Sequence, residues 1–298
     1  MEEIIRFLEN HGIGYARDFS LSRVSAIALG GSCSVFAAPA TETELLKLVA
    51  FLSYGGYKYK VVGKMSNILP SDAPYSGVIV STAKLKAYFV EEGILFAECG
   101  AMLSKAAPLL AREGWGGIAE LSGIPGTVGG MIYSNAGAFG LEISDILIDA
   151  RCYSYEKRAV VTLAPSEMNL SYRHSALSEG GLILLSARLS IKREDPQRAK
   201  LNISEFSRIR RERQPTNFPS LGSTFLRPNG LYAAKLIDDA GLRGFSIGGA
   251  SVSKKHAGFI VNTGAATADD VLRLIEHIQD TVFLKFGVLL VPEIEFLK

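Results

Sequence analysis

One long segment of the chain shows hydrophobic residues at clear helical spacing. Within 268–286 the apolar positions lie three or four residues apart: Val271, Ile275, Ile278, Val282 and Phe286. This spacing places them on one face of a helix, with polar residues on the other. Thr267 can cap the start of this helix and Gly287 can end it. The pattern therefore predicts a helix over 268–286.

The same reasoning predicts the other elements. The stretch 41–44 reads Thr-Glu-Thr-Glu, the form of a capping box, so a helix is expected to begin there. Further helices are expected at 2–10, 102–112, 197–214 and 232–240. Short β-rich runs predict strands at 59–63, 77–81, 94–98, 146–155, 159–163, 182–192, 257–262 and 288–297. Because helices and strands are mixed rather than strictly alternating, we expect an α+β fold.

Pro196 and the charged residues around it mark a boundary in the chain. Strands dominate before this boundary, whereas an arginine-rich helical segment follows it. We therefore expect three units, covering residues 1–75, 76–195 and 200–298. A chain of 298 residues is long enough for such units and for a well-buried core.

Composition narrows the class of protein. Hydrophobic residues make up 48% of the chain and charged residues 21%, which is typical of folded globular proteins. A formal net charge of +2 gives no general indication of nucleic-acid binding. Cys33, Cys99 and Cys152 are far apart and indicate neither a metal site nor a set of disulfides, so a reducing cytoplasm is expected. No signal peptide or membrane-spanning segment is expected.

The segment 116–140 is unusually rich in glycine, at positions 116, 117, 123, 126, 129, 130, 137 and 140. Main-chain N–H groups with little side-chain bulk around them can bind a diphosphate. Glycine turns between strands would explain any single pair, but the length of the run favours a ligand-binding loop. Neither a G-x-G-x-x-G nor a P-loop signature is present, so a Rossmann or P-loop site is not expected.

Two glycine-rich blocks resemble the flavin-binding signature of the MurB-type UDP-N-acetylenolpyruvoylglucosamine reductases: S-G-I-P-G-T-V-G-G at 122–130 and N-A-G-A-F-G at 135–140. Six further blocks are similar to that family and follow in its order: 171–175, 214–215, 222–225, 234–237, 253–259 and 292–294. The resemblance spans nearly the whole chain. The form of residues 222–228 is similar to the smaller subgroup common in Gram-positive bacteria.

The resemblance implies a vanillyl-alcohol-oxidase or PCMH-type FAD-binding fold. Residues 1–75 and 76–195 would be its two α+β FAD-binding subdomains, and 200–298 a C-terminal α+β substrate-binding domain. It also implies non-covalent FAD, NADPH and a small UDP-sugar substrate, with no metal and no nucleic-acid or membrane partner. The implied reaction converts the enolpyruvyl ether of UDP-N-acetylglucosamine to UDP-N-acetylmuramate, a step of peptidoglycan precursor synthesis. NADPH reduces FAD, which then delivers hydride to C3 of the enolpyruvyl group.

That reaction needs a cation for the substrate carboxylate and a proton donor for C2. By resemblance, Arg173 is the cation, Ser223 the proton donor and Glu293 an acid that assists. Arginine suits the first position because its guanidinium stays charged and can bind a carboxylate through two hydrogen bonds. Taken singly, each has a simpler explanation: a surface arginine, a turn serine after glycine and an exposed glutamate beside proline.

The resemblance further implies binding residues. The expected FAD contacts are Gly63, Ser66, Asn67, Gly123, Ile124, Pro125, Gly126, Thr127, Gly130, Asn135 and Gly137. The expected substrate contacts are Tyr172, Arg210 and Arg227. Arg210 lies in the arginine-rich stretch 208–213, which could equally be a solvated helix face. Lys255 and His256 could contact a ligand or have a structural role.

Two blocks depart from the family's pattern. Residues 26–31 keep the glycines of a T-F-[RK]-[IL]-G-G block but lose its polar residues. Residues 63–67 stand where the family has G-G-G-S-N, with Lys64 and Met65 in place of glycines. A side chain at positive φ costs roughly 1–2 kcal/mol, and its bulk could block the approach of amides to a phosphate. Lys64 could instead supply a positive charge to the diphosphate.

Three functions are therefore open. The first is an active FAD- and NADPH-dependent reductase, which Arg173, Ser223 and Glu293 together favour. The second is a catalytically weakened relative that binds a UDP-sugar or another partner without FAD, which the altered loop at 63–67 favours. The third is an FAD oxidase that acts on another alcohol, against which the blocks around Ser223 and Glu293 argue.

Overall fold

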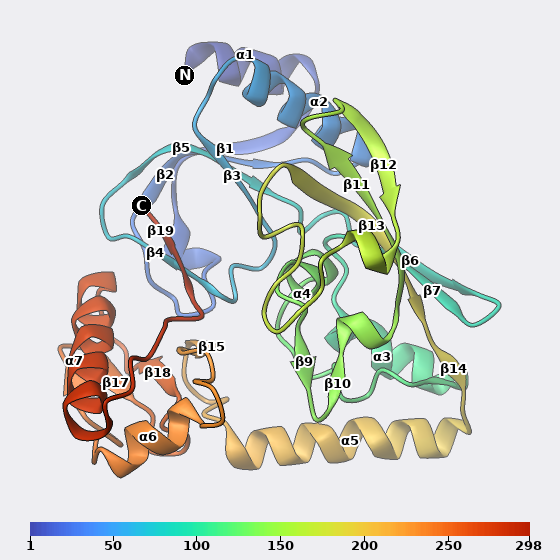
Figure 1. Cartoon of the computed structure of the whole chain (residues 1–298). Coiled ribbons are helices and arrows are strands. Elements are labelled where there is room, and N and C mark those ends of the chain that lie inside the picture. The colour runs from blue at the N-terminus through green and yellow to red at the C-terminus, as the bar shows by residue number, and fades with distance from the viewer. The chain divides into compact units, whose positions relative to one another are not determined.

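The computed structural model describes all residues from 1 to 298, and they form two compact units (Figure 1). Unit 1 consists of Met1–Ala16, Val35–Lys64 and Gly77–Ile209, and unit 2 of Arg17–Ser34, Met65–Ser76 and Arg210–Lys298. Each unit has its own core of buried hydrophobic residues. This grouping differs from the three consecutive segments expected from the sequence, because two N-terminal segments pack with the C-terminal residues.

The α-helices are α1 (Glu2–Asn10), α2 (Glu42–Tyr54), α3 (Leu103–Arg112), α4 (Val128–Tyr133), α5 (Pro196–Arg213), α6 (Ala233–Asp239) and α7 (Ala268–Phe286). The longer strands are β1 (Gly14–Ser20), β2 (Ser32–Ala38), β3 (Tyr59–Val62), β5 (Tyr75–Ser81), β6 (Tyr88–Glu91), β7 (Ile94–Glu98), β11 (Leu147–Ser154), β12 (Ala159–Leu163), β13 (Leu182–Ser190), β15 (Ser220–Ser223) and β18 (Phe259–Asn262). The shorter ones are β4 (Ile68–Pro70), β8 (Trp115–Gly116), β9 (Gly137–Ala138), β10 (Leu141–Glu142), β14 (Lys192–Arg193), β16 (Ser246–Ile247), β17 (Ala250–Val252) and β19 (Glu295–Leu297). None of the helices combines the length and apolar character that crossing a membrane requires.

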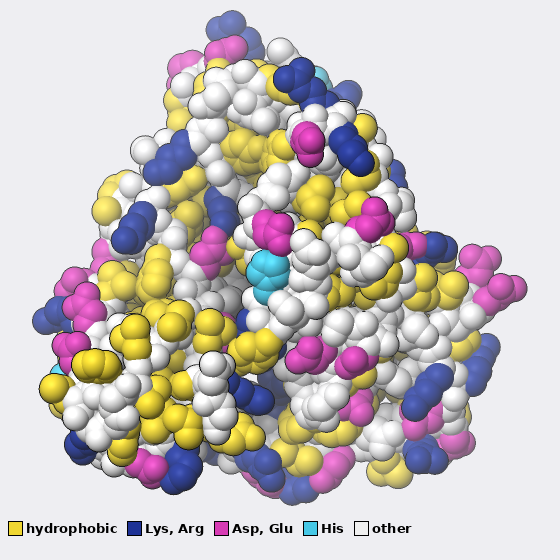
Figure 2. Space-filling model, in the orientation of Figure 1, with side chains coloured by type: hydrophobic (Ala, Val, Ile, Leu, Met, Phe, Trp, Pro, Cys, Tyr) yellow, Lys and Arg dark blue, Asp and Glu magenta, His cyan; other side chains and the backbone are white.

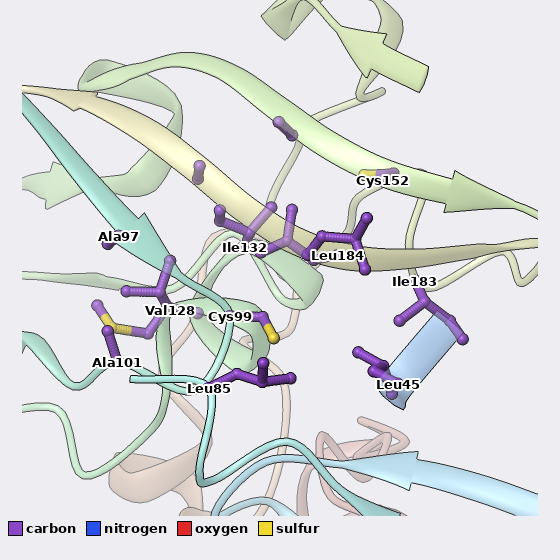
Figure 3. Packing of buried hydrophobic residues seen from close by; sticks show 14 of the residues in the cluster. Leu45, Leu85, Ala97, Cys99, Ala101, Val128, Ile132, Cys152, Ile183 and Leu184 are labelled. Atoms are coloured by element: carbon purple, nitrogen blue, oxygen red, sulfur yellow. The ribbon is translucent and has the colours of Figure 1, made fainter. Parts of the chain in front are cut away.

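A five-stranded antiparallel sheet of order β12-β11-β13-β7-β6 lies at the centre of unit 1. A second sheet has the order β1-β2-β5-β3, in which β3 and β5 are parallel and pair from Tyr59↔Val78 to Val62↔Ser81. Buried residues of α1, α2, α3 and α4 join the same core. Figure 3 shows part of this core, where Ile132 of α4 lies beside Leu184 of β13. The core therefore holds α4, which follows the glycine-rich turn, against the central sheet.

Unit 2 contains an antiparallel sheet of order β15-β18-β17-β16, and α7 packs against β16, β17 and α6. Its core includes the helical positions Val271, Ile275, Ile278 and Val282 expected from the sequence. β19 pairs in parallel with β4, from Glu295↔Ile68 to Leu297↔Pro70. The final strand therefore spans 295–297 rather than the expected 288–297, because β4 offers partners to only these residues.

Local capping explains where two helices begin. The Thr41 hydroxyl accepts a hydrogen bond from the Glu44 N–H at 3.2 Å, and the Thr267 hydroxyl accepts one from the Asp270 N–H at 3.0 Å. Both threonines have extended backbones, as N-cap residues do. Gly287 ends α7 in the left-handed conformation with φ +67°. These capping predictions, and the helix bounds 2–10 and 268–286, are confirmed.

Candidate active site

Two of the loops expected to bind FAD meet in unit 1. A Cβ atom at Gly63 would lie 2.3 Å from Oγ1 of Thr127, so only glycine allows this contact. Thr127 is buried, and its hydroxyl accepts a hydrogen bond from the Gly130 N–H at 3.3 Å. The loop after β3 is therefore packed directly against the glycine-rich turn before α4.

Several amides of this turn are used within the protein. Val128 donates to the carbonyl of Ala101 at 2.7 Å, and Gly129 donates to the carbonyl of Cys99 at 2.8 Å. The Ile124 N–H donates to the Leu121 carbonyl at 3.0 Å. These bonds hold the turn on the core, so these three amides do not serve a ligand.

The Asn135 side chain links two blocks of the sequence through hydrogen bonds. Its side-chain amide donates to Oε2 of Glu142 at 3.0 Å and to the Ser171 carbonyl at 3.1 Å. Its side-chain oxygen accepts from the Ser144 N–H at 2.9 Å. The side chain is buried and its hydrogen-bonding groups are engaged within unit 1. It therefore ties the N-A-G-A-F-G block to the S-Y-R-H-S block.

Tyr172 and Arg173 form the tip of a tight turn. Ser171 and His174 exchange two backbone hydrogen bonds, of 3.2 and 3.1 Å, which close the turn. Arg173 has φ +57°, and its guanidinium carbon lies 5.1 Å from the centre of the Tyr172 ring. The Ser175 hydroxyl donates to the Tyr133 carbonyl at 2.8 Å and anchors the turn near the end of α4. The two hydrogen bonds that close the turn therefore fix the backbone conformation of Arg173.

Ser223 and Glu293 are brought together in unit 2 through Thr224, which lies between them. The Glu293 N–H donates to the Thr224 carbonyl at 2.8 Å, and Phe225 and Pro292 form an antiparallel bridge. Thr224 is itself buried, and its N–H donates to the Gly258 carbonyl at 2.9 Å. Ser223 ends β15 and is exposed. The backbone thus places the expected proton donor and the expected acid on adjacent paired segments.

Asn67 lies on the other side of Glu293. Its side-chain amide donates to the Glu293 carbonyl at 3.1 Å, while its own carbonyl accepts from the Glu295 N–H at 2.9 Å. The sequence indicated only a flavin contact for Asn67 and gave Thr224 no role. Their arrangement around Glu293 depends on strand pairing between distant segments, which no local pattern reports.

Lys64 and Met65, which replace glycines of the family's pattern in the loop 63–67, differ in backbone conformation and in burial. Met65 has φ +48° and is buried, whereas Lys64 is exposed and is not among the residues with positive φ. Only one of the two replaced glycines thus has a conformation that glycine favours. The buried Met65 side chain stabilises the loop through the hydrophobic effect, which offsets part of the cost of its backbone.

At 26–31 the residues that replace the polar ones of the family's pattern are Ala26, which is half-buried, and Ala28, which is exposed with φ +57°. Packing does not explain these two replacements, whereas Ile27 and Leu29 keep the apolar character of the pattern and are buried in the core of unit 2. A Cβ at Gly30 would lie 2.6 Å from Cβ of Pro70, and one at Gly31 would lie 2.4 Å from the Asp72 carbonyl oxygen. The two glycines are therefore needed for the close approach of this segment to residues 70–72.

The arginines near the end of α5 have different surroundings. Arg208 pairs with Glu205 at 2.6 Å, as a solvated helix residue does. Arg210 is half-buried and donates to Oε1 of Gln214 at 3.4 Å, while its buried Nε has no hydrogen-bond partner. Burial lowers the pKa of Arg210, yet an arginine remains protonated. Arg227 lies with its guanidinium carbon 5.2 Å from the centre of the Tyr232 ring.

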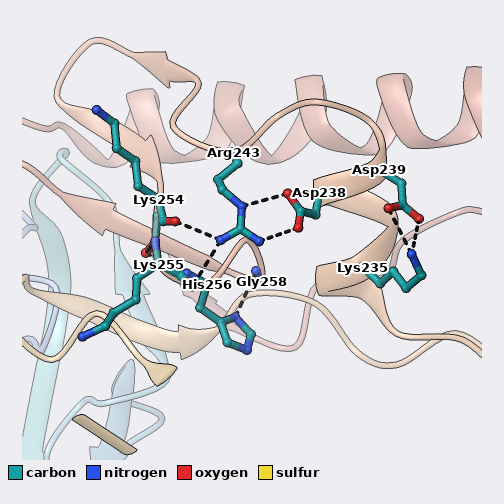
Figure 4. Close-up of polar contacts among 9 residues, drawn as sticks. Lys235, Asp238, Asp239, Arg243, Lys254, Lys255, His256 and Gly258 are labelled. Atoms are coloured by element: carbon teal, nitrogen blue, oxygen red, sulfur yellow. Dashed lines mark hydrogen bonds and ion pairs between the residues drawn. The ribbon is translucent and has the colours of Figure 1, made fainter. Parts of the chain in front are cut away.

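The loop 253–258 is held by Arg243 (Figure 4). Arg243 pairs with Asp238 and donates to the carbonyls of Lys254 at 2.9 Å and Lys255 at 3.2 Å. Nδ1 of His256 accepts from the Gly258 N–H at 3.2 Å, and burial lowers the pKa of His256.

The Lys255 side chain contacts the end of α5. Its ammonium donates to the Arg211 carbonyl at 2.5 Å. A cation is favourable at this end of a helix, where the last carbonyls have no partners within the helix. Lys255 therefore has a structural contact, and His256 has an acceptor that is already occupied.

Charges of both signs are interspersed over the face shown in Figure 2, rather than gathered in one patch. No three His, Cys, Asp or Glu side chains cluster so as to hold a metal ion. The three cysteines are free thiols, and burial raises the pKa of Cys99 and of Cys152 to about 12. A buried thiol with such a pKa is a poor nucleophile at neutral pH.

The residues of the first unit fit a bound flavin diphosphate. The turn before α4 offers backbone with little side-chain bulk, and Gly63 packs against it without a Cβ. The exposed Lys64 adds a positive charge next to that contact. Backbone and charge of this kind suit an anionic ligand.

Two ranges of the chain match known protein families. Residues 33–163 match the FAD binding domain family, and residues 214–297 match the UDP-N-acetylenolpyruvoylglucosamine reductase C-terminal domain family. The UDP-N-acetylenolpyruvoylglucosamine reductase of Caldicellulosiruptor saccharolyticus is 43% identical, over 98% of this chain and 94% of that protein. That of Caldanaerobacter subterraneus is 43% identical over 92% of this chain and 91% of that protein.

A solved structure is similar over the same range. The crystal structure of UDP-N-acetylenolpyruvylglucosamine reductase (MurB) from Thermus caldophilus has a TM-score of 0.81 and 28% identity, and it covers 96% of this chain and 99% of that one. The expected α+β fold with an FAD-binding region is confirmed. This chain belongs to the UDP-N-acetylenolpyruvoylglucosamine reductase family.

Proposed function

We propose that this chain reduces UDP-N-acetylenolpyruvoylglucosamine to UDP-N-acetylmuramate, with non-covalently bound FAD and with NADPH as the reductant. Bound FAD supplies the two-electron chemistry that no side chain of the protein can perform. The observation that carries the proposal is the tethering of Ser223 and Glu293 through Thr224 within the matched C-terminal domain. In an enzyme of this kind we expect the reaction to take place in the cytoplasm.

Arg173 has the role of binding the substrate carboxylate. Electron density that develops at C2 during reduction is delocalised onto that carboxylate, so a fixed cation there lowers the barrier. The closed turn at 171–174 supports this role, because it restricts the arginine backbone before the substrate binds. Tyr172, beside it and 43% exposed, is proposed as a substrate contact.

Ser223 has the role of donating the proton of its hydroxyl to C2. A serine hydroxyl is a weak acid, but a developing carbanion is basic enough to take its proton when the two are aligned. Glu293 assists by stabilising the enol form or by passing a proton to the serine oxygen. The exposure of Ser223 at the end of β15 supports its access to a substrate.

Arg210 and Arg227 are proposed to bind the anionic parts of the substrate. The support is strongest for Arg210, since its half-buried guanidinium keeps a buried Nε without a hydrogen-bond partner. An anionic oxygen would satisfy that donor. Arg227 is exposed and stacked against Tyr232, so it can reach a ligand without being desolvated first.

For FAD we propose contacts from Gly63, Ser66, Gly123, Pro125, Gly126, Thr127 and Gly137, with the charge of Lys64 near the diphosphate. The close packing of Gly63 against Thr127 supports this assignment. Ile124, Gly130, Asn135 and Asn67 are also expected to contact FAD. They use the groups described above within the protein, so any contact would come from their other atoms.

Two measurements test the proposal. The absorption spectrum of the purified protein should show bound flavin, and without oxygen NADPH should be oxidised beyond one equivalent per flavin only when the enolpyruvyl substrate is added. Protein that contains no flavin and cannot be reconstituted with FAD would favour a weakened relative that binds only the UDP-sugar. Flavin that NADPH reduces but that the enolpyruvyl substrate does not reoxidise would contradict the proposed reaction.

A further inference from the structure

The backbone of Glu293 is held by two different elements of unit 2. On one side its N–H donates to the Thr224 carbonyl at 2.8 Å. On the other side its carbonyl accepts from the side-chain amide of Asn67 at 3.1 Å. Each peptide group that flanks this residue therefore has one fixed partner, and the two partners come from segments far apart in the sequence.

Asn67 bonds to this segment twice. Its carbonyl accepts from the Glu295 N–H at 2.9 Å, and this bond begins the parallel pairing of β4 with β19. That bond involves only the main chain, so any side chain at position 67 would preserve it. The side-chain amide is a separate contact, aimed two residues earlier at the carbonyl of Glu293.

From this arrangement we infer that Asn67 is a positioning residue for Glu293: its side-chain amide fixes the orientation of the peptide that carries the acid. Without this bond, the peptide after Glu293 can rotate while β19 remains paired with β4. The inference rests on the role of Glu293 in the proposed function. The loop at 63–67 is proposed to hold FAD. The bond from Asn67 gives the same loop a second role, which is to orient Glu293 for the reduction of the substrate.

Three substitutions separate a hydrogen-bond donor from a residue that merely fills space. Asn67→Ala removes the donor, and Asn67→Asp keeps the size but replaces the donor with an acceptor that faces a carbonyl. Asn67→Gln keeps the donor on a longer side chain. A donor role predicts that the alanine and aspartate variants are impaired and that glutamine recovers part of the loss. A purely steric role predicts that aspartate is tolerated and glutamine is not.

Gln279 offers a matched control. Its side-chain amide donates to the Leu290 carbonyl at 2.8 Å, so it anchors the same C-terminal segment three residues before Glu293. Gln279→Ala removes the same kind of bond without touching the peptide of Glu293. If general anchoring of the segment were sufficient, this variant would behave like Asn67→Ala.

The experiment measures the two half-reactions by stopped flow, with FAD at saturating concentration and its affinity measured separately by fluorescence. For Asn67→Ala and Asn67→Asp we expect the maximal rate of flavin reoxidation by the enolpyruvyl substrate to fall about 2- to 12-fold, the effect of one ordinary hydrogen bond. Flavin reduction by NADPH, the half-saturating substrate concentration and the rates of Gln279→Ala should change by less than about twofold.

Reoxidation of Asn67→Asp at the wild-type rate would overturn the positioning role and leave the proposed function intact. An equal loss in both half-reactions, or an equal loss in Gln279→Ala, would overturn it as well. Wild-type protein that binds FAD but fails to reduce the enolpyruvyl substrate would instead refute the proposed function, and this inference with it.

Discussion

The N–H of Glu293 donates to the carbonyl of Thr224 at 2.8 Å, so the residue next to Ser223 holds the segment that carries the acid. A single backbone hydrogen bond thus couples the two groups proposed to move the proton. Ser223 itself follows Gly222, which has φ +78° and lies at an irregularity in the pairing of β15 with β18. This turn of the backbone leaves the serine exposed at the end of its strand.

Ser223→Ala should block reduction of the substrate and leave reduction of the flavin by NADPH largely unchanged, because Ser223 is proposed to act only in protonating C2. Loss of a positioned general acid typically lowers a rate by about 10²–10⁴-fold. Stopped-flow measurement of flavin reoxidation by the enolpyruvyl substrate gives this rate. Ser220→Ala, in the same strand, is the control and should leave both rates unchanged. Reoxidation of Ser223→Ala at the wild-type rate would rule out the proton-donor role.

Two substitutions of Arg173 should separate the effect of its charge on the reaction from the effect of its backbone conformation on stability. Arg173→Ala and Arg173→Gly both remove the guanidinium, so both should slow reoxidation of the flavin by about 10²-fold or more, in line with the loss of one preorganised group. Because Arg173 has φ +57°, the glycine variant should be more stable to unfolding than the alanine variant by about 1 kcal/mol.

Kinetics and urea denaturation of the two Arg173 variants measure these two effects. Arg188→Ala removes an exposed arginine of the same unit, paired with Asp149, and should leave the kinetics unchanged. If Arg173→Ala reoxidised at the wild-type rate, the substrate carboxylate would have to be bound by another cation.

His256 should make stability depend on pH. Burial lowers its pKa below the ordinary value of 6.5, so the unfolded chain binds this proton more tightly than the native protein does. Its contribution to stability is therefore complete above pH 6.5 and is lost as the pH falls below that value. His256→Asn keeps an acceptor for the Gly258 N–H and removes the titration.

Denaturation of wild type and His256→Asn at pH 7.5 and at pH 5.5 tests this prediction. We expect the wild-type protein to lose more free energy of unfolding between these two conditions than the variant, since all other titrating groups are shared. The same pH dependence in both proteins would show that His256 is not protonated on unfolding in this range.

Asp72 should stabilise α7 from outside the helix. Its two carboxylate oxygens accept from the N–H groups of Ala268 at 2.9 Å and Asp269 at 3.0 Å. Asp72→Ala removes both bonds and a negative charge at the helix N-terminus, so it should lower the free energy of unfolding by about 1–2 kcal/mol. Asp280→Ala, an exposed carboxylate in the middle of α7, is the control and should change it by less than about 0.5 kcal/mol. Equal effects of the two substitutions on the denaturation midpoint would contradict the capping role.

The sequence by itself determined the helices whose signals are local. Thr41 and Thr267 begin α2 and α7, and Gly287 ends α7, because a cap bonds to amides three residues away or adopts a conformation that only glycine adopts easily. It also determined the family, through ordered blocks that extend along nearly the whole chain. Such local signals could not predict the pairing of residues 292 and 225. Nor could they predict that each unit consists of three separate segments of the chain.

Only the tertiary structure decided which residues surround the proposed site. The sequence predicts FAD contacts for Asn67 and Asn135, and that prediction stays open; it gave no sign that their side chains also bond to the Glu293 and Ser171 carbonyls. It likewise did not show that β4 and β19 pair in parallel, which groups residues 65–76 with the C-terminal segment. The physical reason is that a hydrogen bond between residues 226 positions apart depends on how whole strands pair and pack. Neither partner carries a local sequence signal for that choice.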